Sequence, residues 1–197
     1  MPAITDLSQL DLDGTYSYAD YLTWQFQERV ELLRGKIQKM TPAPSVRHQR
    51  ISARLHLQMG NLFRDNQCQL FYAPFDVRLY NRKKSKKASK DIFTVVQPDL
   101  CVICDETKLD EQGCNGAPDL VIEILSPGNT KREMSEKYEL YEEAGVREYW
   151  LVEPNDEIVL IYVLNEQERY IGLQPATEVV QSAIFSGLRI ELAEVFA

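Results

Sequence analysis

The chain has 197 residues, of which 44% are hydrophobic and 26% charged, and its formal net charge is −8. This composition is typical of a soluble globular protein, and a chain of this length buries about 70% of its unfolded surface. No apolar run approaches the ~20 residues of a membrane span and the N-terminus lacks a secretory pattern, so we expect no membrane segment and a cytoplasmic location. The acidic balance argues against binding a polyanion over the whole surface. We expect one domain over residues 1–197, with 1–16 as a loose lead-in.

The first half of the chain alternates between helical and extended patterns. Residues 17–28 follow the pattern of a capped helix, and two alternating runs around the Arg-Gly pair at 34–35 predict a β-hairpin. Apolar residues spaced by three and four positions predict a long amphipathic helix over 46–65. The segments 68–80 and 92–105 are typical of strands, and each contains a proline that cannot donate to a β-ladder.

The second half of the chain predicts a β-α-β unit followed by more strands. The apolar segment 118–126 is typical of a strand that is covered on both faces. A helix is expected over 131–145, ended by Gly145, and the next strand over 147–154. Further strands are expected over 157–165, 168–175 and 177–190, with a short helix over 191–197. The pattern predicts a mixed α/β domain with a central sheet flanked by helices and a right-handed crossover.

Four cysteines occur in the chain, and Cys101 and Cys104 have the C-x-x-C spacing that zinc and redox sites use. Residues three apart on a strand point to opposite faces, so this spacing does not suit one metal ion. We therefore expect Cys68, Cys101, Cys104 and Cys114 to be buried free thiols, with a zinc site or a disulfide as the alternative.

One carboxylate, Glu123, lies in the middle of the apolar strand 118–126. A buried charge costs several kcal/mol, on the order of 3–5, unless it is compensated. Asp99 lies in the neighbouring predicted strand, and if the two strands pair, the two acids lie ~5 Å apart. Such a pair suits a hard cation that activates water for attack on phosphorus. The alternative is an ion pair between Glu123 and a nearby basic residue; Asp119, ~13 Å away along the strand, is interpreted as a structural residue at the strand's start.

The stretches "VVQPDLCVIC" and "GAPDLVIEILSPGNTKREMSEKYELYEEAGVREYWLVEP" resemble the Uma family of restriction endonucleases, a branch of the PD-(D/E)XK nuclease superfamily. The earlier stretch "VELLRGKIQKMTPAPSVRHQRISARL" also fits, so the likeness extends over about residues 17–165. The resemblance implies a restriction-endonuclease-like αβββαβ core, cleavage of DNA with Mg²⁺ (or Mn²⁺), and a homodimer.

The resemblance assigns Asp99 to the "PD" element and Glu123 to the (D/E) position. The lysine expected two residues later is replaced by Leu125, which departs from the superfamily pattern. A lysine there would polarise water or stabilise charge on the phosphorane. We expect Lys137, on the following helix, to reach the site with its flexible stem. The alternatives are that Lys137 is an ordinary solvated residue and that catalysis is weak or lost.

Glu31 and His48 match further positions of the family. Glu31 is expected as an additional metal or water ligand, and its alternative is a solvent-facing acid of the hairpin. His48 is expected to hydrogen-bond a phosphate or a metal ligand, and its alternative is a structural histidine. Gln97 is expected to support the site through hydrogen bonding.

A basic segment over 82–90 predicts contacts with the DNA backbone, because each lysine or arginine can neutralise one phosphate. Its candidate residues are Arg82, Lys83, Lys84, Lys86, Lys87 and Lys90. The alternative is a merely solvated loop. The sequence thus favours a Mg²⁺-dependent DNA endonuclease. Two alternatives stay open: a catalytically weak or inactive nuclease-fold protein that binds nucleic acid or another partner, and an enzyme acting on RNA or small phosphodiesters.

Overall fold

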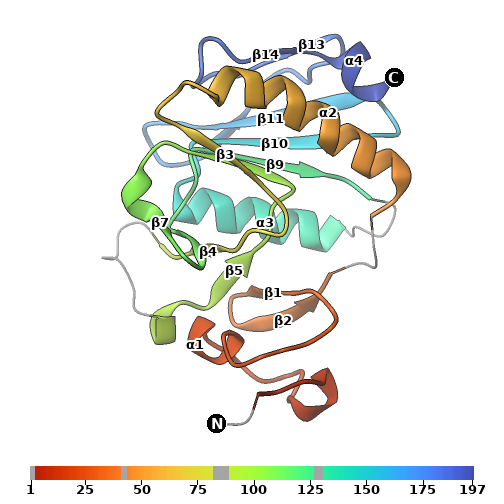
Figure 1. Ribbon diagram of the computed structural model, residues 1–197. Coiled ribbons are helices and arrows are strands. Elements are labelled where there is room, and N and C mark those ends of the chain that lie inside the picture. The colour runs from red at the N-terminus through yellow and green to blue at the C-terminus, as the bar shows by residue number, and fades with distance from the viewer. Residues whose placement is uncertain (1–2, 41–43, 82–88, 127–130) are drawn as a thin grey trace.

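The computed structural model describes residues 3–40, 44–81, 89–126 and 131–197 (Figure 1). Within these ranges the strands form two six-stranded sheets and one two-stranded sheet. None of the helices in this part of the chain combines the length and the apolar character needed to cross a membrane.

The first sheet contains the predicted nuclease-like core. Its strand order is β12-β11-β10-β9-β6-β3, and β9 and β10 are the parallel pair that α3 connects. In chain order the core elements are α2, β3, β6, β9, α3 and β10, so the predicted αβββαβ order is confirmed. Their bounds, with the two strands that extend the sheet, are α2 Val46–Phe63, β3 Gln69–Tyr72, β6 Leu100–Ile103, β9 Leu120–Ile124, α3 Lys131–Ala144, β10 Glu148–Glu153, β11 Ile158–Leu164 and β12 Tyr170–Gly172.

The two long helices cover opposite faces of this sheet (Figure 1). Alternate residues of a strand point to opposite faces, and β9 divides accordingly. Ile122 packs in the cluster that contains Leu55 and Met59 of α2, whereas Val121 packs in the cluster that contains Tyr141 of α3. The apolar character of β9 at consecutive positions follows from this burial on both sides.

A second sheet lies on the far side of α3, with the order β2-β1-β5-β4-β8-β7 (Figure 1). One central sheet was expected, and the second arises because 68–80 and 92–105 each form two strands rather than one. The chain leaves the first sheet at Pro74 and enters it again after Pro98, where a residue without an N–H group cannot continue a ladder. The strand bounds are β1 Val30–Leu33, β2 Lys36–Lys39, β4 Val77–Leu79, β5 Thr94–Val96, β7 Leu109–Asp110 and β8 Gly113–Asn115.

The predicted hairpin over β1 and β2 is present, with a two-residue turn at Arg34 and Gly35. Both turn residues have positive φ, 51° and 83°, as the hairpin turn that matches strand twist requires. The helix expected over 17–28 is much shorter, α1 at Tyr18–Tyr21, because Trp24 forms a β-bridge with Ile4.

The lead-in and the C-terminal region also contain regular structure. The segment 1–16 carries the 3-10 turn η1 with a buried Leu7. The strands expected over 177–190 form a separate two-stranded sheet, and the short terminal helix α4 packs against α2 (Figure 1). The bounds of these and the other short elements are η1 Leu7–Gln9, η2 Ser89–Asp91, η3 Glu106–Lys108, β13 Val179–Gln181, β14 Arg189–Glu191 and α4 Leu192–Phe196.

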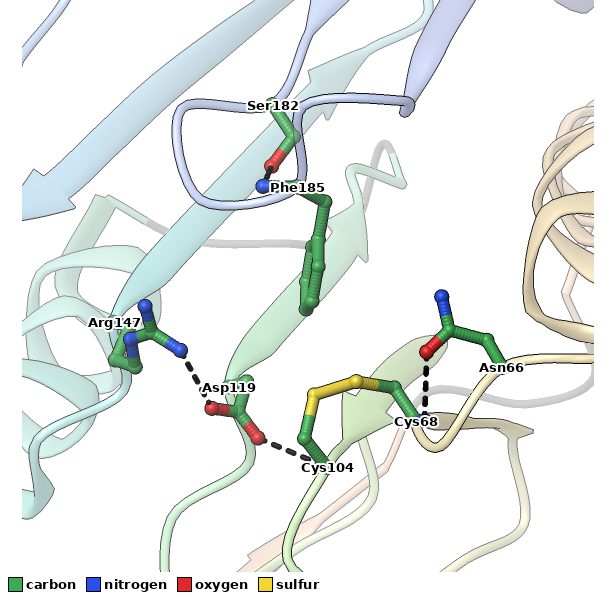
Figure 2. Close-up of a disulfide and its surroundings, with 7 residues drawn as sticks. All are labelled: Asn66, Cys68, Cys104, Asp119, Arg147, Ser182 and Phe185. Carbon is green, nitrogen blue, oxygen red and sulfur yellow. Dashed lines mark hydrogen bonds and ion pairs between the residues drawn. A yellow bond between two sulfur atoms is a disulfide. The ribbon is translucent and has the colours of Figure 1, made fainter.

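The expectation of free thiols is wrong for Cys68 and Cys104, which form a disulfide (Figure 2). Gln69 pairs with Ile103 in the β3–β6 ladder, so the two cysteines are the next facing pair beyond it. Cys101 and Cys114 are buried and free, as expected.

Asp119 lies beside this disulfide and acts as a structural residue (Figure 2). Its two carboxylate oxygens accept hydrogen bonds from the backbone N–H of Cys104 at 2.9 Å and from the Arg147 guanidinium at 3.1 Å. These contacts hold the end of β6 beside the start of β9, in keeping with the structural interpretation.

Candidate active site

A cavity of about 280 Å³ brings together the five side chains that the sequence singled out. Its lining includes Glu31 from β1, His48 from the first turn of α2, Asp99 just before β6, Glu123 from β9 and Lys137 from α3. Residues far apart in the chain meet here because the two sheets and both long helices border the same space.

Two residues on α3 compensate the charge of Glu123 within its apolar strand. The Lys137 ammonium lies 2.9 Å from Glu123 Oε1, and the Tyr141 hydroxyl donates to the same oxygen at 2.6 Å. Burial nevertheless raises the pKa of Glu123 to about 7, with Lys137 opposing this shift and Asp99 and Glu31 adding to it. The ion pair that was weighed as an alternative to metal binding is therefore present.

Asp99 lies beside Glu123 because β6 and β9 pair antiparallel, with Leu100 opposite Ile122. Its Oδ2 accepts the backbone N–H of Ile124 at 2.7 Å and lies 3.2 Å from Nε2 of His48. Burial lowers the pKa of His48, but the hydrogen bond and charge of Asp99 outweigh it, so the net shift is upward. The imidazole therefore orients this carboxylate.

His48 reaches Asp99 from the first turn of α2, where the sequence forms a capped helix start. Ser45 is the N-cap and its hydroxyl accepts the backbone N–H of His48 at 3.2 Å. The cap satisfies one of the N–H groups that a helix start leaves without an intrahelical partner. The side chain of His48 is thereby directed inward and is 92% buried, with 8% of its area exposed.

Glu31 is buried rather than solvent-facing, with 4% of its side chain exposed. Its Oε1 accepts the backbone N–H of Gln97 at 2.8 Å and the Lys137 ammonium at 3.1 Å. Gln97 lies in the segment that connects β5 to β6, and its side-chain oxygen accepts two hydrogen bonds from Arg29. Glu31, on β1 of the second sheet, thus contacts both the segment between β5 and β6 and helix α3.

The three carboxylates share one feature that bears on metal binding. In each, one oxygen carries the protein contacts: Asp99 Oδ2, Glu123 Oε1 and Glu31 Oε1. The second oxygen of each has no hydrogen-bond or ion-pair partner among the described residues. Carboxylate oxygens are the ligands that Mg²⁺ prefers, and Mg²⁺ takes one or two of them and keeps several waters.

The donor set therefore fits a hydrated Mg²⁺ held by Asp99 and Glu123. Over residues 3–40, 44–81, 89–126 and 131–197, no group of three or more His, Cys, Asp or Glu forms a metal cage. An all-protein cage is not what this ion requires, so two carboxylates are sufficient.

Leu125 stands where the resemblance predicted a lysine, and its side chain lines the same cavity as Lys137. Lys137 comes from the helix that follows, as the sequence suggested, and 17% of its side chain is exposed. Burial favours the neutral amine, but Glu123 and Glu31 outweigh it and raise the pKa of Lys137 above its ordinary value. Lys137 is therefore a permanent cation.

Sequence reasoning missed Tyr141 and Tyr149. Tyr141 is fully buried and binds Glu123, and Tyr149 from β10 lines the cavity and contacts the Tyr141 ring. A signal for Tyr141 was available, since it follows Lys137 by four residues and such residues share a helix face.

The basic segment is described only in part. Lys90 is exposed in η2, which packs against α1, and it does not line the cavity. The other five candidates, Arg82, Lys83, Lys84, Lys86 and Lys87, lie outside the described residues.

Comparison with known proteins agrees with the fold. The family model described as "Uma2: Putative restriction endonuclease" matches residues 18–193. A similar solved structure is that of "a putative nuclease belonging to DUF820" from Anabaena variabilis ATCC 29413, with 18% identity and a TM-score of 0.70 over 92% of this chain and 97% of that one. At this identity the likeness concerns the fold. No curated protein matched. Because the family model matches most of the chain, this protein belongs to the Uma2 family, described as putative restriction endonucleases.

Proposed function

We propose that this protein hydrolyses phosphodiester bonds of DNA with Mg²⁺ or Mn²⁺ as cofactor. The observation that carries the proposal is a cavity in which Asp99 and Glu123 lie next to the Lys137 ammonium. Among the described residues, one carboxylate oxygen of each acid has no hydrogen-bond or ion-pair partner. Such a set of groups suits a reaction in which negative charge develops on a phosphoryl group.

Each side chain has a distinct part in this proposal. Asp99 and Glu123 hold the metal ion, which when bound polarises the phosphoryl oxygen and lowers the pKa of a bound water. His48 orients Asp99, and Glu31 orients Lys137 and the backbone at Gln97. Lys137 stabilises the developing negative charge, and it does not accept a proton because its raised pKa keeps it protonated. We also propose a homodimer, on the resemblance alone, and we retain the expectation of a cytoplasmic location.

A catalytically weak or inactive nucleic-acid-binding protein is the second candidate. The Lys137–Glu123–Glu31 contacts favour it, because they already neutralise part of the carboxylate charge without a metal ion. In that case the carboxylates would serve stability rather than catalysis.

A metal titration and a cleavage assay separate the two candidates. We expect calorimetry to detect Mn²⁺ binding, and we expect plasmid and single-stranded DNA to be cut with Mn²⁺ or Mg²⁺ but not with EDTA. Asp99→Asn and Glu123→Gln should abolish both binding and cutting. Glu178→Gln, which changes an exposed acid away from the cavity, is the matched control. Cutting that persists in both acid variants would disprove these roles, and absence of Mn²⁺ binding would favour the second candidate.

A further inference from the structure

A large exposed aromatic side chain stands at the cavity that holds the carboxylates. Tyr72 is the last residue of β3, 60% of its surface is exposed, and it lines the same cavity as Asp99 and Glu123. Isolated exposed aromatic residues are common, so exposure alone assigns no role. The position of Tyr72 relative to the acids is more informative.

Strand register and one backbone hydrogen bond place Tyr72 at the same end of the sheet as Asp99. Tyr72 is the Cα partner of Leu100, which directly follows Asp99, and the N–H of Ala73 donates to the Asp99 carbonyl at 3.2 Å. Because Tyr72 and both carboxylates line one cavity, a phosphate bound at the carboxylates would have its own or the adjacent nucleobase within reach of the Tyr72 ring.

The ring is also held in place before any ligand arrives. His56 of α2 packs against Tyr72 in an edge arrangement, with the ring centroids 4.8 Å apart and the planes at 83°. The contact fixes the ring orientation while most of the residue stays exposed. Little side-chain entropy is then lost when a flat ligand stacks on it.

The same cavity also carries positive charge. Arg29 and Lys39, both exposed, line the cavity from the β1–β2 hairpin and the segment just before it. Gln49 and Ser52 of α2 line the same cavity and offer hydrogen-bonding groups. Cations that can contact a phosphate backbone, together with an exposed aromatic ring, are the combination that binds single-stranded nucleic acid.

We propose that Tyr72 is the stacking platform for an unpaired base beside the scissile phosphate. The inference rests on the proposed function and names its substrate class, a DNA strand that is unpaired at the cut site, such as single-stranded DNA or an overhang. A base within a duplex has both faces covered by its neighbours, so it cannot stack on a protein ring unless it is flipped out of the helix.

Binding can be tested without cleavage. A short single-stranded DNA carrying 2-aminopurine is titrated with the full chain in Ca²⁺ instead of Mg²⁺, and fluorescence reports stacking. We expect quenching with the wild-type protein and with Tyr72→Phe, which keeps the ring. Tyr72→Ala should lose the quenching and bind about tenfold or more weakly. Phe93→Ala removes another exposed aromatic, 43% exposed and not lining the cavity, and should match wild type.

The cleavage arm compares single-stranded and duplex DNA of one sequence in Mg²⁺. We expect faster cutting of the single strand, with the advantage lost in Tyr72→Ala and kept in Tyr72→Phe. Unchanged binding by Tyr72→Ala, or equal cutting of duplex and single strand, overturns the inference even if the protein is a nuclease. Ring-dependent binding with no cutting of any DNA supports the platform and overturns the proposed hydrolysis instead.

Discussion

Replacing Lys137 with methionine tests the electrostatic account of the cavity. The ammonium group lies 2.9 Å from Glu123 and 3.1 Å from Glu31, and all three side chains are largely buried. Lys137→Met keeps much of the apolar stem but leaves two carboxylates without their cation. Loss of one partner of a buried ion pair costs about 3–5 kcal/mol. We expect the free energy of unfolding to fall by that amount in metal-free buffer at about pH 8.

The loss should become smaller as the pH falls. Burial already raises the pKa of Glu123 from 4.5 to about 7 while Lys137 opposes the shift, so removing Lys137 raises this pKa further. A carboxyl group with a raised pKa binds more protons in the folded state than in the unfolded state. Its folded form therefore gains stability as the pH falls toward 4.5, the unfolded value, and loses stability as the pH rises.

The measurement is urea unfolding with EDTA at about pH 6 and pH 8, followed by the fluorescence of the buried Trp150. Lys90→Met, a change at an exposed lysine away from the cavity, is the matched control and should leave stability unchanged. If Lys137→Met is as stable as wild type at the higher pH, the electrostatic reasoning is refuted. Added Mn²⁺ should restore part of the loss if the carboxylates bind metal.

Two further substitutions test neighbouring contacts. Tyr141→Phe removes only the hydroxyl that donates to Glu123 Oε1. We expect this variant to bind Mn²⁺ about 10–100-fold more weakly in calorimetry and to fold like wild type by circular dichroism. Unchanged affinity would show that the hydroxyl does not position Glu123 for the metal ion. Glu148 is fully buried and accepts hydrogen bonds from Trp150, Ser182 and the backbone of Ala183 and Ile184. Glu148→Gln should therefore lower the free energy of unfolding by about 2–4 kcal/mol in urea titrations. A smaller effect would mean that these donors find other partners.

Leu125 lies where a lysine was expected, and the proposed role of that lysine falls to Lys137, which lines the same cavity. A lysine at position 125, directly after β9, would reach the cavity from the sheet, whereas Lys137 reaches it from α3. The move is sterically reasonable because α3 packs against the sheet face that β9 presents to it. The flexible lysine stem can then span the remaining distance to Glu123.

The spacing of apolar residues and the turn residues predicted those elements correctly that bury a single face or end in a tight turn. The long helix at 46–65 was predicted from its apolar spacing, and the structure has α2 at Val46–Phe63. The hairpin at Arg34 and the helix that ends at Gly145 were likewise found. In these cases hydrophobic period and turn chemistry are properties of neighbouring residues, so the sequence alone carries them.

Pattern failed where a contact between distant residues decided the outcome. The bridge from Trp24 to Ile4 shortened the expected helix at 17–28, and the disulfide joined Cys68 to Cys104. The split of two apolar runs between two sheets also depended on which strands they could pair with. Propensity is a weak prior beside such tertiary contacts.

The amino-acid sequence by itself determined the αβββαβ order and named Asp99, Glu123 and Lys137 as the residues to examine. Only the tertiary structure decided that Lys137 pairs with both Glu123 and Glu31, and that one oxygen of each acid stays free of protein partners among the described residues. It also placed Tyr72 in the same cavity as Asp99. The physical reason is that local order depends on residues a few positions apart, whereas a cavity depends on strand register and on the packing of elements far apart in the chain.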